Sequence, residues 1–163
     1  SCRNREGLEA LLQNGADPDL GIDGTFLPVI VAATYDDPVM LAVLLDYGAN
    51  PNVADAKATQ TPLYKAFAIG LHRNQWDNYE LLLARGANIE FEDQVGDTIV
   101  HYALAMGRYD KVVALLERGY SLKLEELFGR MKRRTVSESF EQQYQLRERA
   151  LSMVASKLGL RNT

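Results

Sequence analysis

The chain has 163 residues, of which 47% are apolar and 25% charged, and its formal net charge is −4 at pH 7. This length suits one compact unit or a short solenoid that buries a core without disulfides. A single cysteine, Cys2, excludes an internal disulfide framework and a multi-cysteine zinc site. No apolar run in the sequence approaches the roughly 18 residues that a membrane-spanning helix needs.

The first predicted helix covers residues 7–14 and ends at Gly15. Leu8 and Leu11 share one of its faces, as the 3.6-residue period of an amphipathic helix requires. Residues 16–24 follow as a segment rich in Asp, Gly and Pro, which favour turns.

Cys2 allows two interpretations. It is either the lipid-bearing first residue of a bacterial lipoprotein, which places the chain in the periplasm or at a membrane surface, or an ordinary thiol. An ordinary thiol packs as a small hydrophobe and fits a cytoplasmic protein equally well.

Three longer units follow, each predicted to contain two helices. The helices of the second unit, residues 27–49, are divided near residues 36–38. The third unit has a longer connection, residues 69–78, which contains the only tryptophan, Trp76. That side chain either covers the local core or anchors a partner. The fourth unit, residues 98–120, has the most regular pattern.

These units are copies of one repeat. In each, a pair of leucines is followed after two further residues by a glycine, and these glycines lie 33, 38 and 33 residues apart. A fixed period in this range is typical of stacked supersecondary units. A helix that must stop and turn is capped most easily by a residue that takes a positive φ. The predicted caps are Gly15, Gly48, Gly86 and Gly119.

A second motif precedes three of these caps and reads Thr-Pro-Leu-Tyr-Lys-Ala in the third unit. Thr61 and Thr98 are predicted helix N-caps, and Pro62 falls on the first helical turn, where its missing N–H costs nothing. The three versions of the motif occupy residues 27–32, 61–66 and 98–103.

The two motifs recur in phase, and together they resemble the ankyrin repeat over about residues 3–122. The resemblance implies an all-α solenoid of stacked helix-turn-helix repeats with projecting fingers. It also implies that His101, at the histidine position of the motif, bridges backbone groups of adjacent repeats. The first of about four copies keeps only its second helix, so we expect that a further helix or a targeting segment preceded it.

After residue 122 the period is lost. Amphipathic spacing within residues 123–163 predicts one short and one long helix, and two unlike helices suit the open end of a solenoid. We therefore expect repeats over 1–122 and a helical cap over 123–163. The basic cluster Arg130 to Arg134 is interpreted as a solvated helix end, with phosphate binding as the alternative.

Charge is divided unevenly along this plan. Residues 1–122 contain 9 Lys/Arg and 17 Asp/Glu, whereas residues 123–163 contain 9 and 5. An acidic surface attracts a basic protein partner and repels nucleic acid. The acidic residues of the predicted fingers are Asp17, Asp19, Asp23, Asp55, Glu90, Glu92, Asp93 and Asp97.

Little in the sequence suggests catalysis. Apart from His101, the only histidine is His72, which has no serine or cysteine nearby to activate. The sequence has no nucleophile elbow, phosphate loop or metal-binding His/Glu spacing. We therefore predict a non-enzymatic protein without cofactor or metal.

The sequence predicts a protein-binding scaffold, monomeric when alone, that uses its concave face of fingers and inner helices. Similarity to bacterial ankyrin proteins, some of which neutralise a co-encoded toxin, suggests an inhibitor or immunity protein. The alternative is a regulatory or interaction fragment of a larger enzyme chain. The predicted partner-binding residues are Asp23, Tyr35, Asp55, Lys57, Lys65, Trp76, Glu92, Asp93, Tyr102 and Met106.

Overall fold

The structure is a computed structural model, and it describes residues 2–21, 26–35, 37–55, 60–120, 152 and 156. The chain divides into two compact units, residues 1–99 and 100–163. Among the described residues, no helix is both long and apolar enough to cross a membrane.

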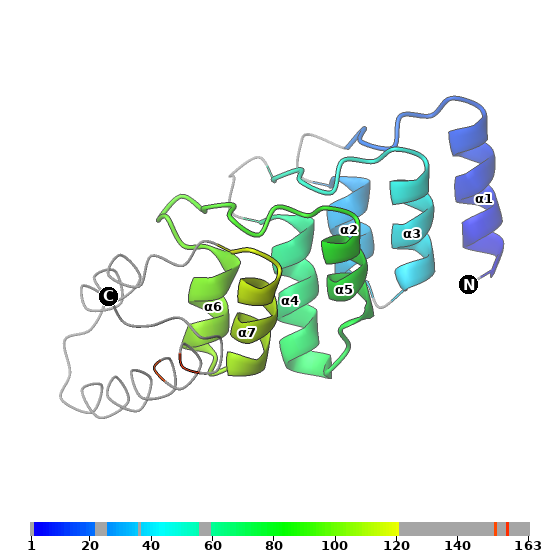
Figure 1. Ribbon diagram of the computed structural model, residues 1–163. Helices are drawn as coiled ribbons and strands as arrows, with labels where there is room; N and C mark the ends of the chain where they lie inside the picture. The colour runs from blue at the N-terminus through cyan, green and yellow to red at the C-terminus, as the bar shows by residue number, and fades with distance from the viewer. Residues whose placement is uncertain are drawn as a thin grey trace. The chain divides into compact units, whose positions relative to one another are not determined.

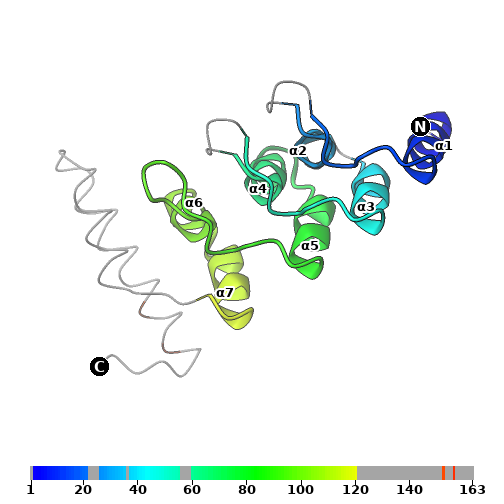
Figure 2. The same ribbon diagram turned by 90° about the horizontal axis from the view of Figure 1, so that it is seen from above.

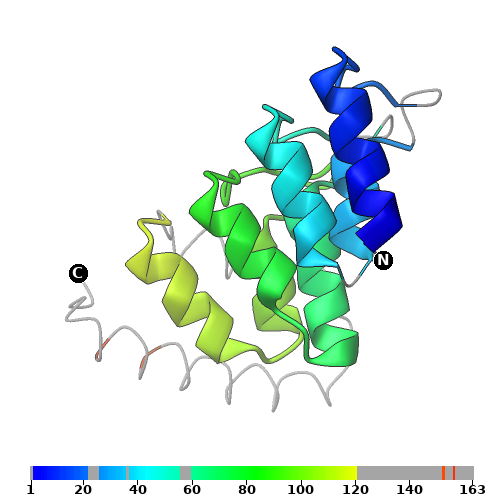
Figure 3. The ribbon, with the colours of Figure 1, turned by 90° about the vertical axis from the view of Figure 1, so that its right-hand side faces the viewer.

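The first unit consists of two rows of helices, seen from two sides in Figures 1 and 2. The inner row contains α2 (Pro28–Thr34) and α4 (Pro62–Arg73), and the outer row contains α1 (Cys2–Gln13), α3 (Pro38–Asp46) and α5 (Asp77–Ala84). Neighbours within each row pack side by side, as Figure 3 shows for the outer row. In addition, α2 packs against α3 and α4 against α5. This arrangement confirms the predicted all-α stack of helix-turn-helix repeats.

The second unit contains α7 (Tyr109–Glu117) and all of α6 (Ile99–Ala105) except its first residue. These are the two helices predicted for the fourth repeat. The helices predicted within 123–163 and the cluster Arg130 to Arg134 fall outside the described residues, apart from residues 152 and 156. The predicted division at residue 122 therefore stays a prediction.

Helices α3 and α4 begin where the sequence indicates. The hydroxyl oxygen of Thr61 accepts a hydrogen bond from the backbone N–H of Tyr64 at 3.2 Å, which confirms Thr61 as the N-cap of α4. Asp37 caps α3 in the same way, accepting from the N–H of Val39 at 3.1 Å. Each of these caps satisfies a backbone donor that has no partner within the helix.

The four capping glycines all take the left-handed backbone conformation that the repeat pattern predicts. Their φ angles are 86° at Gly15, 89° at Gly48, 79° at Gly86 and 95° at Gly119. In the second repeat the turn is closed by the N–H of Ala49, which donates to the carbonyl of Leu44 at 3.0 Å. Bonds of this kind satisfy carbonyl groups at the C-terminal end of the helix.

Two predicted boundaries differ from the structure. Helix α1 begins at Cys2, five residues earlier than predicted. The insertion in the third repeat does not form a loop over residues 69–78, because α4 continues to Arg73 and only residues 74–76 connect it to α5. Asn74, directly after α4, has a left-handed φ of 56°, and its N–H donates to the carbonyl of Gly70. The extra residues therefore lengthen the inner helix.

The core of the first unit lies between its two rows of helices. Its largest fully buried side chains come from α3, α4 and α5, and burying each of them removes apolar surface from water. They are Leu41, Leu63, Phe67, Tyr79 and Leu82.

Candidate binding surface

The fingers of the first unit begin with the same side-chain turn. Asp17, Asn50 and Asn88 each lie two residues after a capping glycine. Each side-chain oxygen accepts a hydrogen bond from the backbone N–H two residues further on, at 2.9 Å. This turn allows Asp and Asn to replace a backbone turn with their own side chain.

Consecutive fingers are also bonded to one another. The Asp19 carboxylate accepts from the backbone N–H of Asn50 at 3.0 and 3.2 Å. In the next repeat, the Asn52 side-chain oxygen accepts from the N–H of Asn88 at 2.6 Å. These bonds fix the spacing of the fingers. This role was not predicted from the sequence, although the recurrence of Asp or Asn two residues after Gly15, Gly48 and Gly86 was a signal for it.

Two of the predicted partner-binding acids organise their own fingers. Asp93 accepts hydrogen bonds from the N–H groups of Val95 and Asp97, both at 2.9 Å. Asp55 accepts from the N–H of Gln60 at 3.1 Å. Replacing either carboxylate therefore removes a turn contact as well as a charge.

The acidic surface is smaller than the sequence suggested. Asp97 is only 7% exposed, because it lies in the turn that leads into α6, so it was wrongly counted among the surface charges. Asp17, Glu90 and Glu92 are exposed. Asp23 and Lys57 lie outside the described residues.

Tyr35 is the most exposed aromatic side chain predicted to bind a partner. It follows α2 directly and is 67% exposed. Its backbone is held from both sides: its N–H donates to the carbonyl of Val31 at 3.1 Å, and its carbonyl accepts from the Asn78 side chain at 2.7 Å. The buried Asn78, on α5, also reaches the carbonyl of Ala32 at 3.3 Å. Asn78 was not predicted from the sequence.

Trp76 lies in an aromatic cluster between α4 and α5. Its ring centroid is 5.7 Å from that of Phe67 and 5.6 Å from that of Tyr79, with edge-on geometry to both. A Cβ atom placed on Gly70 would lie only 2.5 Å from two carbon atoms of the indole ring. Trp76 therefore packs locally, and a contact between its half-buried ring and a partner stays a prediction.

The other predicted positions are divided between the two units. Lys65 is half-exposed on α4 of the first unit. In the second unit, Tyr102 and His101 are half-buried on α6, and Met106 is exposed directly after it. Thr98 is buried immediately before α6, and its predicted capping bond stays a prediction.

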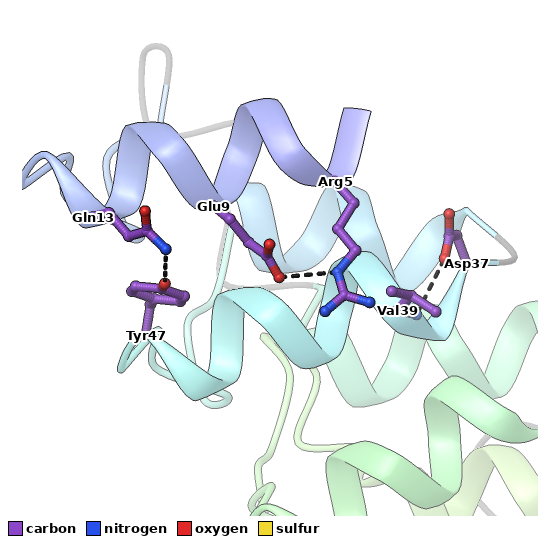
Figure 4. Close-up of polar contacts among 6 residues, drawn as sticks. All are labelled: Arg5, Glu9, Gln13, Asp37, Val39 and Tyr47. Atoms are coloured by element: carbon purple, nitrogen blue, oxygen red, sulfur yellow. Dashed lines mark hydrogen bonds and ion pairs between the residues drawn. The ribbon is translucent and has the colours of Figure 1, made fainter. Parts of the chain in front are cut away.

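On the outer row, polar contacts join neighbouring helices. The Gln13 side chain on α1 donates to the hydroxyl of Tyr47 at 3.1 Å, at the end of α3 (Figure 4). Asp46 forms an ion pair with Arg85 at 2.7 Å, which links α3 to the end of α5. Figure 4 also shows the Arg5–Glu9 ion pair within α1, at 2.9 Å. Two of these contacts therefore join neighbouring helices of the outer row, and the third lies within α1.

The described part of the chain contains no group of three or more His, Cys, Asp or Glu side chains arranged to hold a metal ion. The surface of the first unit carries fingers that are hydrogen-bonded to one another, exposed carboxylates and the exposed Tyr35 side chain.

Comparison with known proteins identifies related sequences. The family model described as "Ankyrin repeats (3 copies)" matches residues 29–126. The chain is 38% identical over 104 residues to Protein PhlB of Serratia liquefaciens, covering 63% of this chain and 44% of that protein.

Two eukaryotic proteins are also similar. The ADP-ribosylation factor GTPase-activating protein AGD4 of Arabidopsis thaliana is 35% identical over 77 residues, which are 47% of this chain and 9% of that protein. The glycerophosphocholine phosphodiesterase gde1 of Schizosaccharomyces pombe is 30% identical over 100 residues, 61% of this chain and 8% of that protein. The chain thus spans less than half the length of each of these three relatives.

Proposed function

We infer the function from one premise: this chain belongs to the ankyrin-repeat family. Ankyrin repeats are protein–protein interaction scaffolds and are typically non-catalytic. We propose that this chain binds a protein partner through the inner helices and fingers of its repeats. The fold alone does not identify that partner, so the chemistry of the partner is inferred from the exposed surface of this chain.

The exposure of Tyr35 carries the proposal. A large aromatic side chain that is 67% exposed leaves apolar surface in water, and aromatic side chains are enriched among residues that dominate interface energy. Hydrogen bonds fix its backbone from α2 and from α5. Because the backbone is already ordered, binding a partner there costs less conformational entropy.

The charge of the fingers favours a partner with a basic surface. Asp17, Glu90 and Glu92 are exposed, and the bonds between fingers hold the fingers at a fixed spacing. Complementary charge mainly accelerates association and selects the partner, whereas desolvated aromatic contacts mainly slow dissociation.

For the biological role, we propose an inhibitor or immunity protein that neutralises a toxin or effector. The similarity to a protein of the bacterium Serratia liquefaciens fits this role. A second candidate is an interaction segment within a larger enzyme. It is favoured by the match to one relative with an enzyme name, the phosphodiesterase gde1, of which the chain covers 8%.

Affinity capture from the native host, with this chain as bait, tests the proposal. Each captured protein is then measured by surface plasmon resonance against the wild-type chain, Tyr35→Ala and the control Val39→Ala. Val39 is an exposed apolar residue on the outer helix α3. We expect Tyr35→Ala to dissociate about tenfold faster or more, and Val39→Ala to bind as wild type. Equal dissociation of the two variants contradicts the proposed surface.

A further inference from the structure

The two inner helices of the first unit differ in charge from the fingers beside them. α2 and α4 together contain one lysine and one arginine, Lys65 and Arg73, and no Asp or Glu. The fingers of this unit instead carry exposed acidic side chains, which are Asp17, Glu90 and Glu92. The inner face of the first unit therefore has an acidic part and a basic part.

Lys65 lies on the face of α4 that points away from the core. After its first residue, the buried positions of α4 follow the spacing of one helix face and are Leu63, Ala66, Phe67 and Gly70. Lys65, Ile69 and His72 are spaced i, i+4 and i+7 and therefore share the opposite face. Lys65 and Ile69 are half-exposed, whereas His72 and the adjacent Arg73 are exposed.

The other cations described in the first unit are already paired within the fold. Arg5 forms an ion pair with Glu9, and Arg85 forms one with Asp46, both on the outer row. In the part of this unit that the structure describes, no ion pair involves Lys65 or Arg73. The charges of α4 are therefore available to a partner.

The longer inner helix of the third repeat carries Arg73 away from the fingers. α4 has 12 residues and α2 has 7. When the two copies of the motif are aligned, Ile69 takes the place of Tyr35, so His72 and Arg73 lie beyond the length of α2. The fingers lead into the first turns of α2 and α4, and Arg73 is in the last turn of α4, at the other end (Figure 1).

We propose that the exposed face of α4 binds carboxylate side chains of the protein partner, while basic side chains of the same partner face the fingers. This inference rests on the proposed function and adds the charge pattern of the partner. A guanidinium such as that of Arg73 binds a carboxylate through paired hydrogen bonds. A partner of uniform charge would set like charges against one of the two regions, which lowers affinity. Nucleic acid is disfavoured, because the fingers repel its phosphates.

A phage-displayed library of random peptides is the probe. It is selected on the wild-type chain, and the enriched peptides, synthesised with blocked termini, are measured by fluorescence anisotropy against variants of the chain. Tyr35→Ala identifies the peptides that use the proposed surface. Arg73→Glu and Lys65→Glu test the basic part of that surface. Arg85→Glu is the control, because it changes the net charge by the same amount on the outer row.

We expect the peptides that depend on Tyr35 to contain Asp or Glu as well as Lys or Arg. They should bind Arg73→Glu or Lys65→Glu about tenfold more weakly or worse, and should bind Arg85→Glu as they bind the wild type. The inference is overturned if these peptides lack carboxylates, or if neither α4 variant weakens them more than the control does. The proposed function would survive that result, because the peptides still use Tyr35. If no enriched peptide depends on Tyr35, the proposed surface is wrong and this inference fails with it.

Discussion

The side-chain amide of Asn78 donates a 2.7 Å hydrogen bond to the backbone carbonyl of Tyr35, although the two residues are 43 positions apart. This bond joins the start of α5 to the end of α2, across two repeats. The carbonyl of Tyr35 lies at a helix C-terminus, where carbonyl groups have no partner within the helix. The bond satisfies this carbonyl and holds the backbone of the exposed tyrosine.

Asn78→Leu should therefore destabilise the first unit by about 1–3 kcal/mol, because the carbonyls of α2 lose a buried donor. Urea unfolding followed by circular dichroism measures this change. Gln75→Leu, at an exposed position in the neighbouring connection, is the control and should be close to neutral. Equal stability of the two variants would show that the bonds to α2 add nothing.

Gly70→Ala should destabilise the fold by about 1–3 kcal/mol, since the new methyl group collides with the ring of Trp76. The shift of the indole should also change the emission of the only tryptophan. The control is Gly7→Ala in α1, where an added Cβ meets nothing within 4 Å. That change should stabilise its helix by up to about 1 kcal/mol. Unchanged emission and stability in Gly70→Ala would contradict the packing of Trp76 on α4.

Gly48→Val should cost more than about 1 kcal/mol, because a β-branched residue is strained at a φ of 89°. Gly48→Asn should cost less, since asparagine tolerates the left-handed region. Thermal unfolding of the two variants gives the comparison. If valine and asparagine lowered the melting temperature equally, backbone strain would not be the cause.

Asp110 should titrate below the usual range of an aspartate. Its hydrogen bond from Arg108, at 2.8 Å, is the main cause of its lowered pKa, and burial opposes the shift. A pKa lowered by folding stabilises the fold above the unfolded-state pKa, and this contribution is lost as the pH falls through the lowered value. Carboxyl carbon NMR should show the low pKa, and Arg108→Gln should raise it. An unchanged Asp110 titration in that variant would rule out Arg108 as the cause.

The sequence predicted the features that recur, because each copy of the repeat reports on the same local geometry. The positive φ at Gly48 and Gly86 and the cap at Thr61 follow from the residue types alone. The extension of α4 did not follow from the residue types, because Gly70 suggests a helix break. The structure uses this glycine to accommodate the ring of Trp76. Asn78 was also missed, since its bonds join residues of different repeats.

The candidate surface was predicted less completely than the fold. The fingers are acidic, but charge counts do not show which carboxylates the backbone uses. Asp93 and Asp55 accept backbone hydrogen bonds, and Asp97 is buried in its turn. Tyr35, predicted as a partner-binding residue on an inner helix, lies directly after α2 and is 67% exposed, and its contact with a partner stays a prediction.

The most direct test of the central claim, that the inner face of the repeats binds a protein, is a hydrogen–deuterium exchange footprint of the chain with its captured partner. We expect the amides at the end of α2, around Tyr35, and those of the finger around Glu92 to exchange more slowly in the complex. Protection confined to the outer helices α1, α3 and α5, with Tyr35 and Glu92 unaffected, would contradict the account.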